Sequence, residues 1–158
     1  MPKQPAFPSL RDAMKKKQTR RELFLAQMEA VVPWGRVLAL IAPQYPKAGP
    51  KLGPTGGHLP MPLEVMLRVY FRQNWYALSD PAAEETLYDS EAMRRFAGIE
   101  LGYDRIPDET TILNFRHLLE CHGLTETIFA EVNAHLADKG ITRHSGTLVD
   151  VSRRAPCA

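Results

Sequence analysis

Apolar side chains recur at three- and four-residue intervals along most of the sequence, and this period limits the fold to packed helices. The clearest stretch has one apolar face formed by Leu63, Met66, Leu67, Tyr70 and Phe71. Glu64, Arg68 and Arg72 form a row on the opposite side and are expected to face solvent. We therefore predict an all-α chain whose aromatic stripe belongs to a core.

Capping and turn residues mark where these helices begin and end. Side-chain oxygens that can accept helix N–H groups predict N-caps at Asp80, Ser90, Asp108 and Thr125. Leu124 and Phe129 are expected to pack together as a hydrophobic staple around Thr125. Helix ends are expected at Gly98, Gly123 and Gly140. Besides the helix that starts at Leu63, helices are expected at about 19–32, 33–41, 81–88, 90–97, 108–121 and 125–139.

A stretch crowded with Pro and Gly interrupts the helical pattern and divides the chain. We expect a basic arm over residues 1–18, N-terminal helices over 19–42, a Pro/Gly-rich loop over 43–61 and a helical domain over 62–141. Residues 145–158 contain a short β-branched run, which predicts a strand stub. The expected fold is a multi-helix bundle with a helix-turn-helix-like unit over 81–121 and this stub at its end.

Composition and length agree with one globular domain. The 158 residues are 44% hydrophobic and 24% charged, which is ordinary for a compact soluble chain. No apolar run approaches the ~20 residues that cross a bilayer, and no apolar stretch follows the basic N-terminus as a signal peptide requires. We expect a cytoplasmic protein.

The charge is concentrated at the N-terminus. Residues 1–21 hold seven Lys and Arg against one Asp, although the whole chain has a net charge of only +2. The run Lys15, Lys16 and Lys17 can neutralise DNA phosphates and release counterions, without selecting a sequence. The alternative is a solvated tail.

The expected helix at 108–121 has the polar face that DNA recognition requires. Its outward side chains are expected to be Thr110, Thr111, Asn114, Arg116 and His117. In helix-turn-helix proteins the N-terminal half of such a helix enters the major groove, where Asn pairs with adenine and Arg with guanine. The alternative is an ordinary solvated helix face.

Three further arginines, Arg94, Arg95 and Arg105, are candidates for holding the flanking phosphates. The alternative is ion pairing with nearby acids such as Glu91 or Asp104. His117 and Cys121 lie one helical turn apart, but the chain lacks a second ligand pair, so a zinc site is not expected.

Two longer motifs go beyond these class-level patterns. SDPAAEETLYDS at 79–90 and RIPDETTILNFRHLLE at 105–120, followed by a helix and GTLVD, resemble the N-terminal half of bacterial insertion-sequence transposases of the DDE class, specifically the insertion-sequence-five family. The resemblance covers residues 20–150. It implies a helical region that binds the terminal inverted repeats of the element, ahead of a ribonuclease-H-like catalytic domain.

By the same resemblance, Asp150 matches the first acid of the catalytic Asp-Asp-Glu set. The parent family uses Mg²⁺, held by several acids around two ions. This chain continues with polar residues in place of the family's apolar strand and lacks the second Asp and the Glu. We therefore expect a truncated fragment that is not an enzyme, binds no cofactor of its own and uses Asp150 as a metal ligand only with the missing acids.

The resulting expectation is a DNA-binding fragment whose partner is double-stranded DNA in the bacterial nucleoid. Three alternatives remain open. The chain is a regulator that competes with or pairs with intact transposase, it is a helical oligomerisation module such as a homodimer, or a frameshift near residue 150 makes it the first half of a full enzyme.

Overall fold

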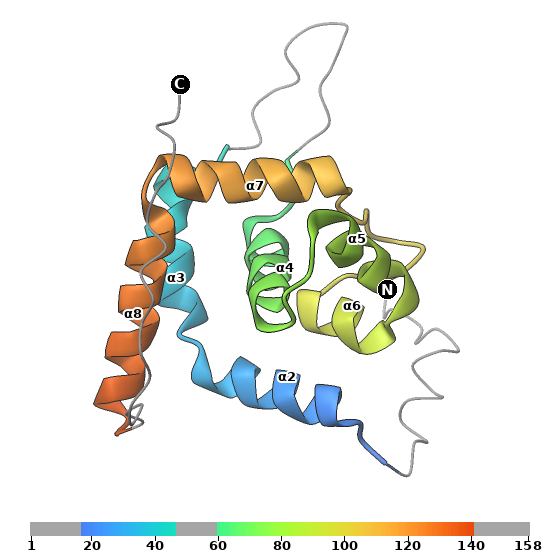
Figure 1. Ribbon diagram of the computed structural model, residues 1–158, viewed down its shortest axis with the longest axis horizontal. Coiled ribbons are helices and arrows are strands. Elements are labelled where there is room, and N and C mark those ends of the chain that lie inside the picture. The colour runs from blue at the N-terminus through green and yellow to red at the C-terminus, as the bar shows by residue number, and fades with distance from the viewer. Residues whose placement is uncertain (1–16, 47–59, 141–158) are drawn as a thin grey trace, which may run out of the picture. The chain divides into compact units, whose positions relative to one another are not determined.

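The computed structural model describes residues 17–46 and 60–140. Within these ranges the chain is all-helical, with seven α-helices and one 3₁₀ turn and no strand (Figure 1). This confirms the expected fold class. The strand stub predicted for residues 145–158 lies outside the described residues.

The chain divides into two compact units, residues 1–30 and 31–158. The first contributes most of α2, Arg20–Val31. Thr19 and Glu22 form a reciprocal capping box, because the backbone N–H of each donates to the side chain of the other, at 2.7 and 3.2 Å. The predicted start of this helix near Thr19 is confirmed.

The second unit contains the remaining helices. They are α3 (Trp34–Ile41), the 3₁₀ turn η1 (Ala42–Gln44), α4 (Leu63–Trp75), α5 (Asp80–Asp89), α6 (Glu91–Ala97), α7 (Glu109–Cys121) and α8 (Leu124–Asp138). Helix α4 packs against α3, α5, α6 and α7, while α8 packs against α3 and α7 (Figure 1). The fully buried apolar side chains of this core include Val37, Ile41, Leu67, Val69, Leu87 and Leu119.

Most of the predicted helix boundaries are confirmed. Ser90 caps α6 by accepting from the Met93 N–H at 3.4 Å. Asp108 caps α7, and Gly98 ends α6 at a left-handed φ of 77°. Gly123 and Gly140 also have positive φ where α7 and α8 end.

Two predicted N-caps are wrong. The cap of α5 is Ser79, whose hydroxyl accepts from the Ala82 N–H at 3.2 Å, and Asp80 lies in the first turn. Helix α8 begins at Leu124 after Gly123, so Thr125 lies inside the helix. Because Leu124 is itself the first residue of α8, it does not precede a cap at Thr125, and the predicted staple around that cap is wrong as well.

Arg72 contradicts the expectation that it faces solvent. Its side chain is fully buried, and its guanidinium donates to the carbonyls of Met93 and Ala83 at 3.0 and 3.4 Å and to the Thr86 hydroxyl at 3.3 Å. A buried charge requires several such acceptors to offset its desolvation. Arg72 therefore joins α4 to α5 and α6.

An aromatic cluster joins α3, α4 and α6, which confirms that the aromatic stripe of α4 is structural. Trp34 meets Phe71 and Phe96 edge to face at centroid distances of 5.4 and 5.8 Å. The Arg68 guanidinium lies 4.3 Å from the Trp34 ring centre, and it donates to the Phe96 carbonyl. Arg68 is thus a cation–π partner that holds α4 against α3 and α6.

Tyr45 and Met61 connect the two sides of the Pro/Gly-rich segment. The Tyr45 hydroxyl donates to the Met61 carbonyl, and burial raises the pKa of the Tyr45 phenol. The Tyr45 ring also contacts Phe115 at 6.0 Å. This hydrogen bond therefore holds together two residues that are 16 positions apart in the sequence, one on each side of the Pro/Gly-rich segment.

Among residues 17–46 and 60–140, no single helix has the length and apolar character needed to cross a membrane. A bent pair, Arg20–Val31 with Trp34–Gln44, meets both criteria only when the two helices are taken together.

Candidate nucleic-acid interface

Helix α7 starts at a strong cap. The Thr111 N–H donates to the Asp108 carboxylate at 2.7 Å. Hydrogen bonds from Thr111, through its side chain and then its backbone, hold the pKa of Asp108 below its usual range, and the nearby Arg105 charge acts in the same direction. The cap fixes the orientation of the first turn, where a groove-reading helix makes its contacts.

The two sides of α7 differ as the periodicity predicts. Ile112, Phe115 and Leu119 are buried in the core. Thr110, Asn114 and His117 are exposed and follow one another at four- and three-residue spacing. Their side chains form a polar row whose hydrogen-bonding groups are available to a ligand. We call these three residues the α7 row. Thr111, also a predicted site residue, is only half-buried and belongs to the cap.

Arg116 does not lie in this row. Its Nη2 donates to the Asp80 Oδ2 at 3.0 Å, and its Nε lies 3.0 Å from the Asp80 Oδ1 without hydrogen-bond alignment. Asp80 also accepts from the Gln73 Nε2 at 2.6 Å. These side chains connect α4, α5 and α7, so the candidate base-reading arginine is committed to an internal polar network.

The three arginines expected to hold phosphates are placed differently from one another. Arg94 donates to the Leu87 and Tyr88 carbonyls at 2.9 and 2.7 Å, which satisfies the C-terminal end of α5. Arg95 forms an i, i+4 ion pair with Glu91 at 3.1 Å, the alternative considered for it. Arg105 is exposed beside Asp108.

Acidic side chains surround the first turn of α7. The Glu84 carboxylate accepts from the Glu109 N–H at 2.8 Å, and Asp108 occupies the cap. These carboxylates already satisfy the positive end of the helix dipole. A phosphate group would therefore gain little binding energy at the N-terminus of α7. Contacts between the α7 row and base edges would not need a phosphate bound at that end of the helix.

Helices α6 and α7 do not form a short helix-turn-helix. Residues 98–108 separate them, whereas that motif uses a turn of three or four residues. Helix α5 instead packs on both α6 and α7. The unit that presents the α7 row is therefore built around α5 and α4.

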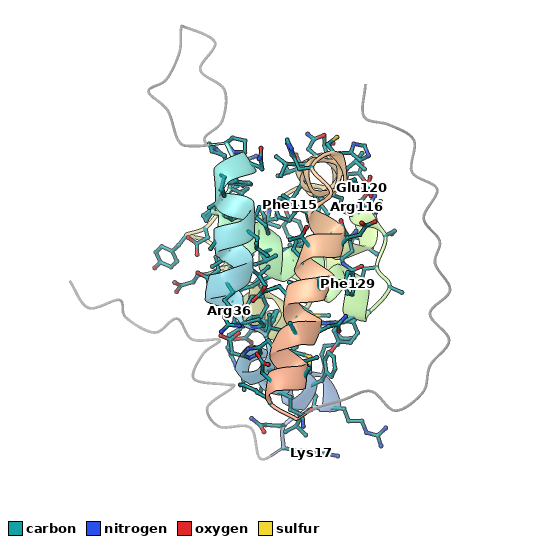
Figure 2. All side chains as sticks on the ribbon, turned by 90° about the vertical axis from the view of Figure 1, so that its left-hand side faces the viewer. Lys17, Arg36, Phe115, Arg116, Glu120 and Phe129 are labelled. Carbon is teal, nitrogen blue, oxygen red and sulfur yellow. The ribbon has the colours of Figure 1, made fainter. Side chains whose placement is uncertain are left out.

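The remaining predicted site residues belong to other parts of the chain. Lys17 is exposed just before α2 and is labelled in Figure 2. Lys15, Lys16 and Asp150 lie outside the described residues. In the part that the structure describes, no three His, Cys, Asp or Glu side chains meet in a way that could hold a metal ion.

The network partners Asp80 and Gln73 were missed as site residues. An Asp-Pro pair is typical of a helix start, so the sequence pattern predicts a cap at Asp80 and no further role for its carboxylate. The sequence does contain a usable signal, since Ser79 competes for the same cap and leaves the carboxylate of Asp80 available.

Comparison with known protein families finds a match over most of the chain. Residues 12–118 match the family model of the transposase domain (DUF772). The matched range includes α2 to α6 and most of α7, with the whole α7 row. No solved structure matches this chain.

Proposed function

Because this chain belongs to the transposase domain family (DUF772), whose role is in transposition, we propose that it binds double-stranded DNA at the terminal inverted repeats of its mobile element. The observation that carries the proposal is the α7 row, Thr110, Asn114 and His117, exposed on a helix whose opposite face is locked in the core. The finer resemblance to the insertion-sequence-five family supports the same proposal.

The chemistry of the row suits base edges in the major groove. The Asn114 amide combines an NH₂ donor group with a carbonyl acceptor, the pair that matches adenine, and the Thr110 methyl suits a thymine methyl. Both lie in the N-terminal half of α7. Cap and core together hold the row in one orientation, which lowers the entropy cost of binding.

Phosphate contacts in this proposal come mainly from the basic arm. Arg94, Arg95 and Arg116 each have a partner within the chain, although the Arg95 pair with Glu91 is exposed, and acids surround the α7 start. Lys15, Lys16 and Lys17, with the exposed Arg20, supply the positive charge. Binding through this arm is salt-dependent and insensitive to sequence, whereas the α7 row supplies selectivity.

We also propose that the 158-residue chain binds without cutting. By resemblance Asp150 is the first acid of a DDE set, and one acid alone does not build a two-metal phosphoryl-transfer site. Incubating the protein and element-end DNA with Mg²⁺ or Mn²⁺ tests this: intact strands are expected, and nicked or joined products would contradict it.

Replacing Asn114 with Ala tests the recognition role. The affinity for a duplex carrying the terminal repeat should fall about tenfold, because a bidentate base contact is worth about 1–3 kcal/mol, while the affinity for a scrambled duplex should change little. Asn133→Ala, at an exposed Asn on α8, is the matched control. Equal losses on both duplexes, or no loss on either, would refute recognition by the row.

Exposed apolar side chains favour one alternative, a helical oligomerisation module. Leu101, Tyr103 and Phe129 are 53%, 76% and 56% exposed. Sedimentation of the full chain distinguishes the two functions: a dimer that Phe129→Ser breaks, together with no preference for repeat DNA, would support the module.

A further inference from the structure

The second half of α8 is less completely buried than the first half. The buried residues of this helix, Leu124 and Ile128, both lie in its first two turns. Phe129, Val132 and Leu136 follow at i, i+3 and i+7 and form an apolar strip, which we call the α8 strip. Val132 and Leu136 are half-buried, and Phe129 is 56% exposed and projects from α8 in Figure 2. Covering this strip with a further segment of chain would be favourable, because it removes apolar surface from water.

The end of α8 has the geometry of a Schellman turn. Gly140 has a left-handed φ of 74°, and its N–H donates to the Ala137 carbonyl at 3.0 Å. This is the hydrogen bond that closes such a turn two residues after the helix, and an apolar contact between the residue after the glycine and the helix residue four positions before the glycine commonly accompanies it. Here those two positions are Ile141 and Leu136, and both are apolar. The turn therefore favours a start of the next segment against the end of the α8 strip.

The segment that follows this turn has side chains suited to the strip. Residues 141–158 lie outside the described residues, and their sequence contains the apolar side chains Ile141, Leu148, Val149 and Val151. Because the segment is joined directly to α8, its effective concentration at the strip is on the order of mM without any partner. Among the possible occupants of the α8 strip, this segment therefore needs the least affinity to be bound.

The cysteines of the chain supply an independent observation. Cys121 is exposed at the end of α7 and takes part in a disulfide. The sequence contains one other cysteine, Cys157. The 15 residues of α8 span about 22 Å, whereas the segment from Ile141 to Cys157 can span about 50 Å when extended. A segment that returns along α8 is therefore long enough to reach Cys121.

We infer that residues 141–158 turn back at Gly140, cover the α8 strip and are joined to α7 by a disulfide between Cys121 and Cys157. The bond forms by exchange with a disulfide oxidant such as glutathione disulfide. One cysteine thiolate attacks the oxidant and releases one glutathione, and the second cysteine attacks the mixed disulfide and releases another. The two protein thiols are thereby oxidised, so the position of the segment depends on the redox conditions. The inference does not depend on DNA binding.

The test equilibrates the full chain with mixtures of glutathione and glutathione disulfide, and mass spectrometry of alkylated peptides measures the fraction with Cys121 joined to Cys157. This fraction gives the effective concentration of the two thiols. The same measurement in concentrated urea supplies the value for an undocked chain, which is on the order of mM. The folded chain should exceed that value by about tenfold or more, because burial of apolar side chains on the strip holds the thiols together. Equal values with and without urea, or links only between two chains, would overturn the inference.

A pair of variants separates docking on the α8 strip from mere proximity of the two thiols. Because the Phe129 ring is 56% exposed, Phe129→Ser leaves the core intact, and it should lower the effective concentration in the folded chain about fivefold through lost apolar contact. Ala137→Ser, at an exposed position on a different side of α8, is the matched control and should leave the value unchanged. No loss in Phe129→Ser, or equal losses in the two variants, would overturn docking on the strip.

Discussion

The contact between Arg116 and Asp80 decides whether Arg116 is a structural residue or a DNA-reading one. A double-mutant cycle measures it through four proteins: wild type, Arg116→Ala, Asp80→Ala and the double variant. The free energy of unfolding of each is obtained from urea denaturation followed by circular dichroism.

The magnitude follows from geometry and exposure. Two contacts of 3.0 Å join the side chains, which are 36% and 16% exposed. Exposed pairs couple by about 0.2–1 kcal/mol, and a charge-assisted hydrogen bond with partial burial raises this, so we expect a coupling of about 1–2 kcal/mol. Asp80→Ala should cost more than Arg116→Ala, because it also removes the acceptor of the buried Gln73 amide.

The control is Arg36→Ala, at a side chain 61% exposed with a single 3.4 Å contact to Glu131, where a loss below about 0.5 kcal/mol is expected. A coupling near zero, together with an Arg116→Ala loss no larger than that of the control, would refute the structural role. Arg116 would then be available for DNA, as first expected from the sequence.

Three further predictions concern the buried arginine, the end of α4 and the α7 cap. Arg72→Met should destabilise the chain by about 1–3 kcal/mol in urea, since the Met93 carbonyl and the Thr86 hydroxyl lose a buried donor, and unchanged stability would contradict its bridging role. Ala77→Gly should stabilise the chain by about 0.5–1 kcal/mol, because Ala77 has a left-handed φ of 50°, which is strained for a residue with a Cβ and not for glycine. An unchanged or lower melting temperature would argue against strain there. Asp108→Asn should reduce the acid sensitivity of unfolding. The pKa of Asp108 is lowered in the folded chain, so its carboxylate stabilises the fold above the unfolded pKa of about 4. This stabilisation is lost as the pH falls through the pKa of Asp108 in the folded chain. Parallel pH profiles of melting temperature for wild type and Asp108→Asn would count against that cap.

Much of the fold was predictable from local signals. The caps at Ser90 and Asp108 and the end at Gly98 are determined within three or four residues, a range that the sequence displays directly. Asp80 shows where this fails, because two neighbouring oxygen-bearing side chains competed for one cap and the hydroxyl of Ser79 took it. At α8, Gly123 ends one helix and begins the next, which left no place for Thr125 as a cap.

The site was predictable only where periodicity determines it. The exposed positions of Thr110, Asn114 and His117 follow from 3.6 residues per turn. The commitment of Arg116 depends on Asp80, 36 residues earlier in the chain, and no local pattern reports such a pairing. Arg72 was placed on the solvent side for the same reason, since its acceptors are carbonyls on α5 and α6 that exist only after folding.

Photocrosslinking from position 114 tests the central claim most directly. The full chain is made with a benzophenone amino acid at position 114, or at position 133 as the control, and is irradiated on duplex DNA carrying the element end. The account predicts crosslinks from position 114 to a few adjacent bases within the terminal repeat and none from position 133. Bound protein that crosslinks only from position 133, or from neither position, would contradict it.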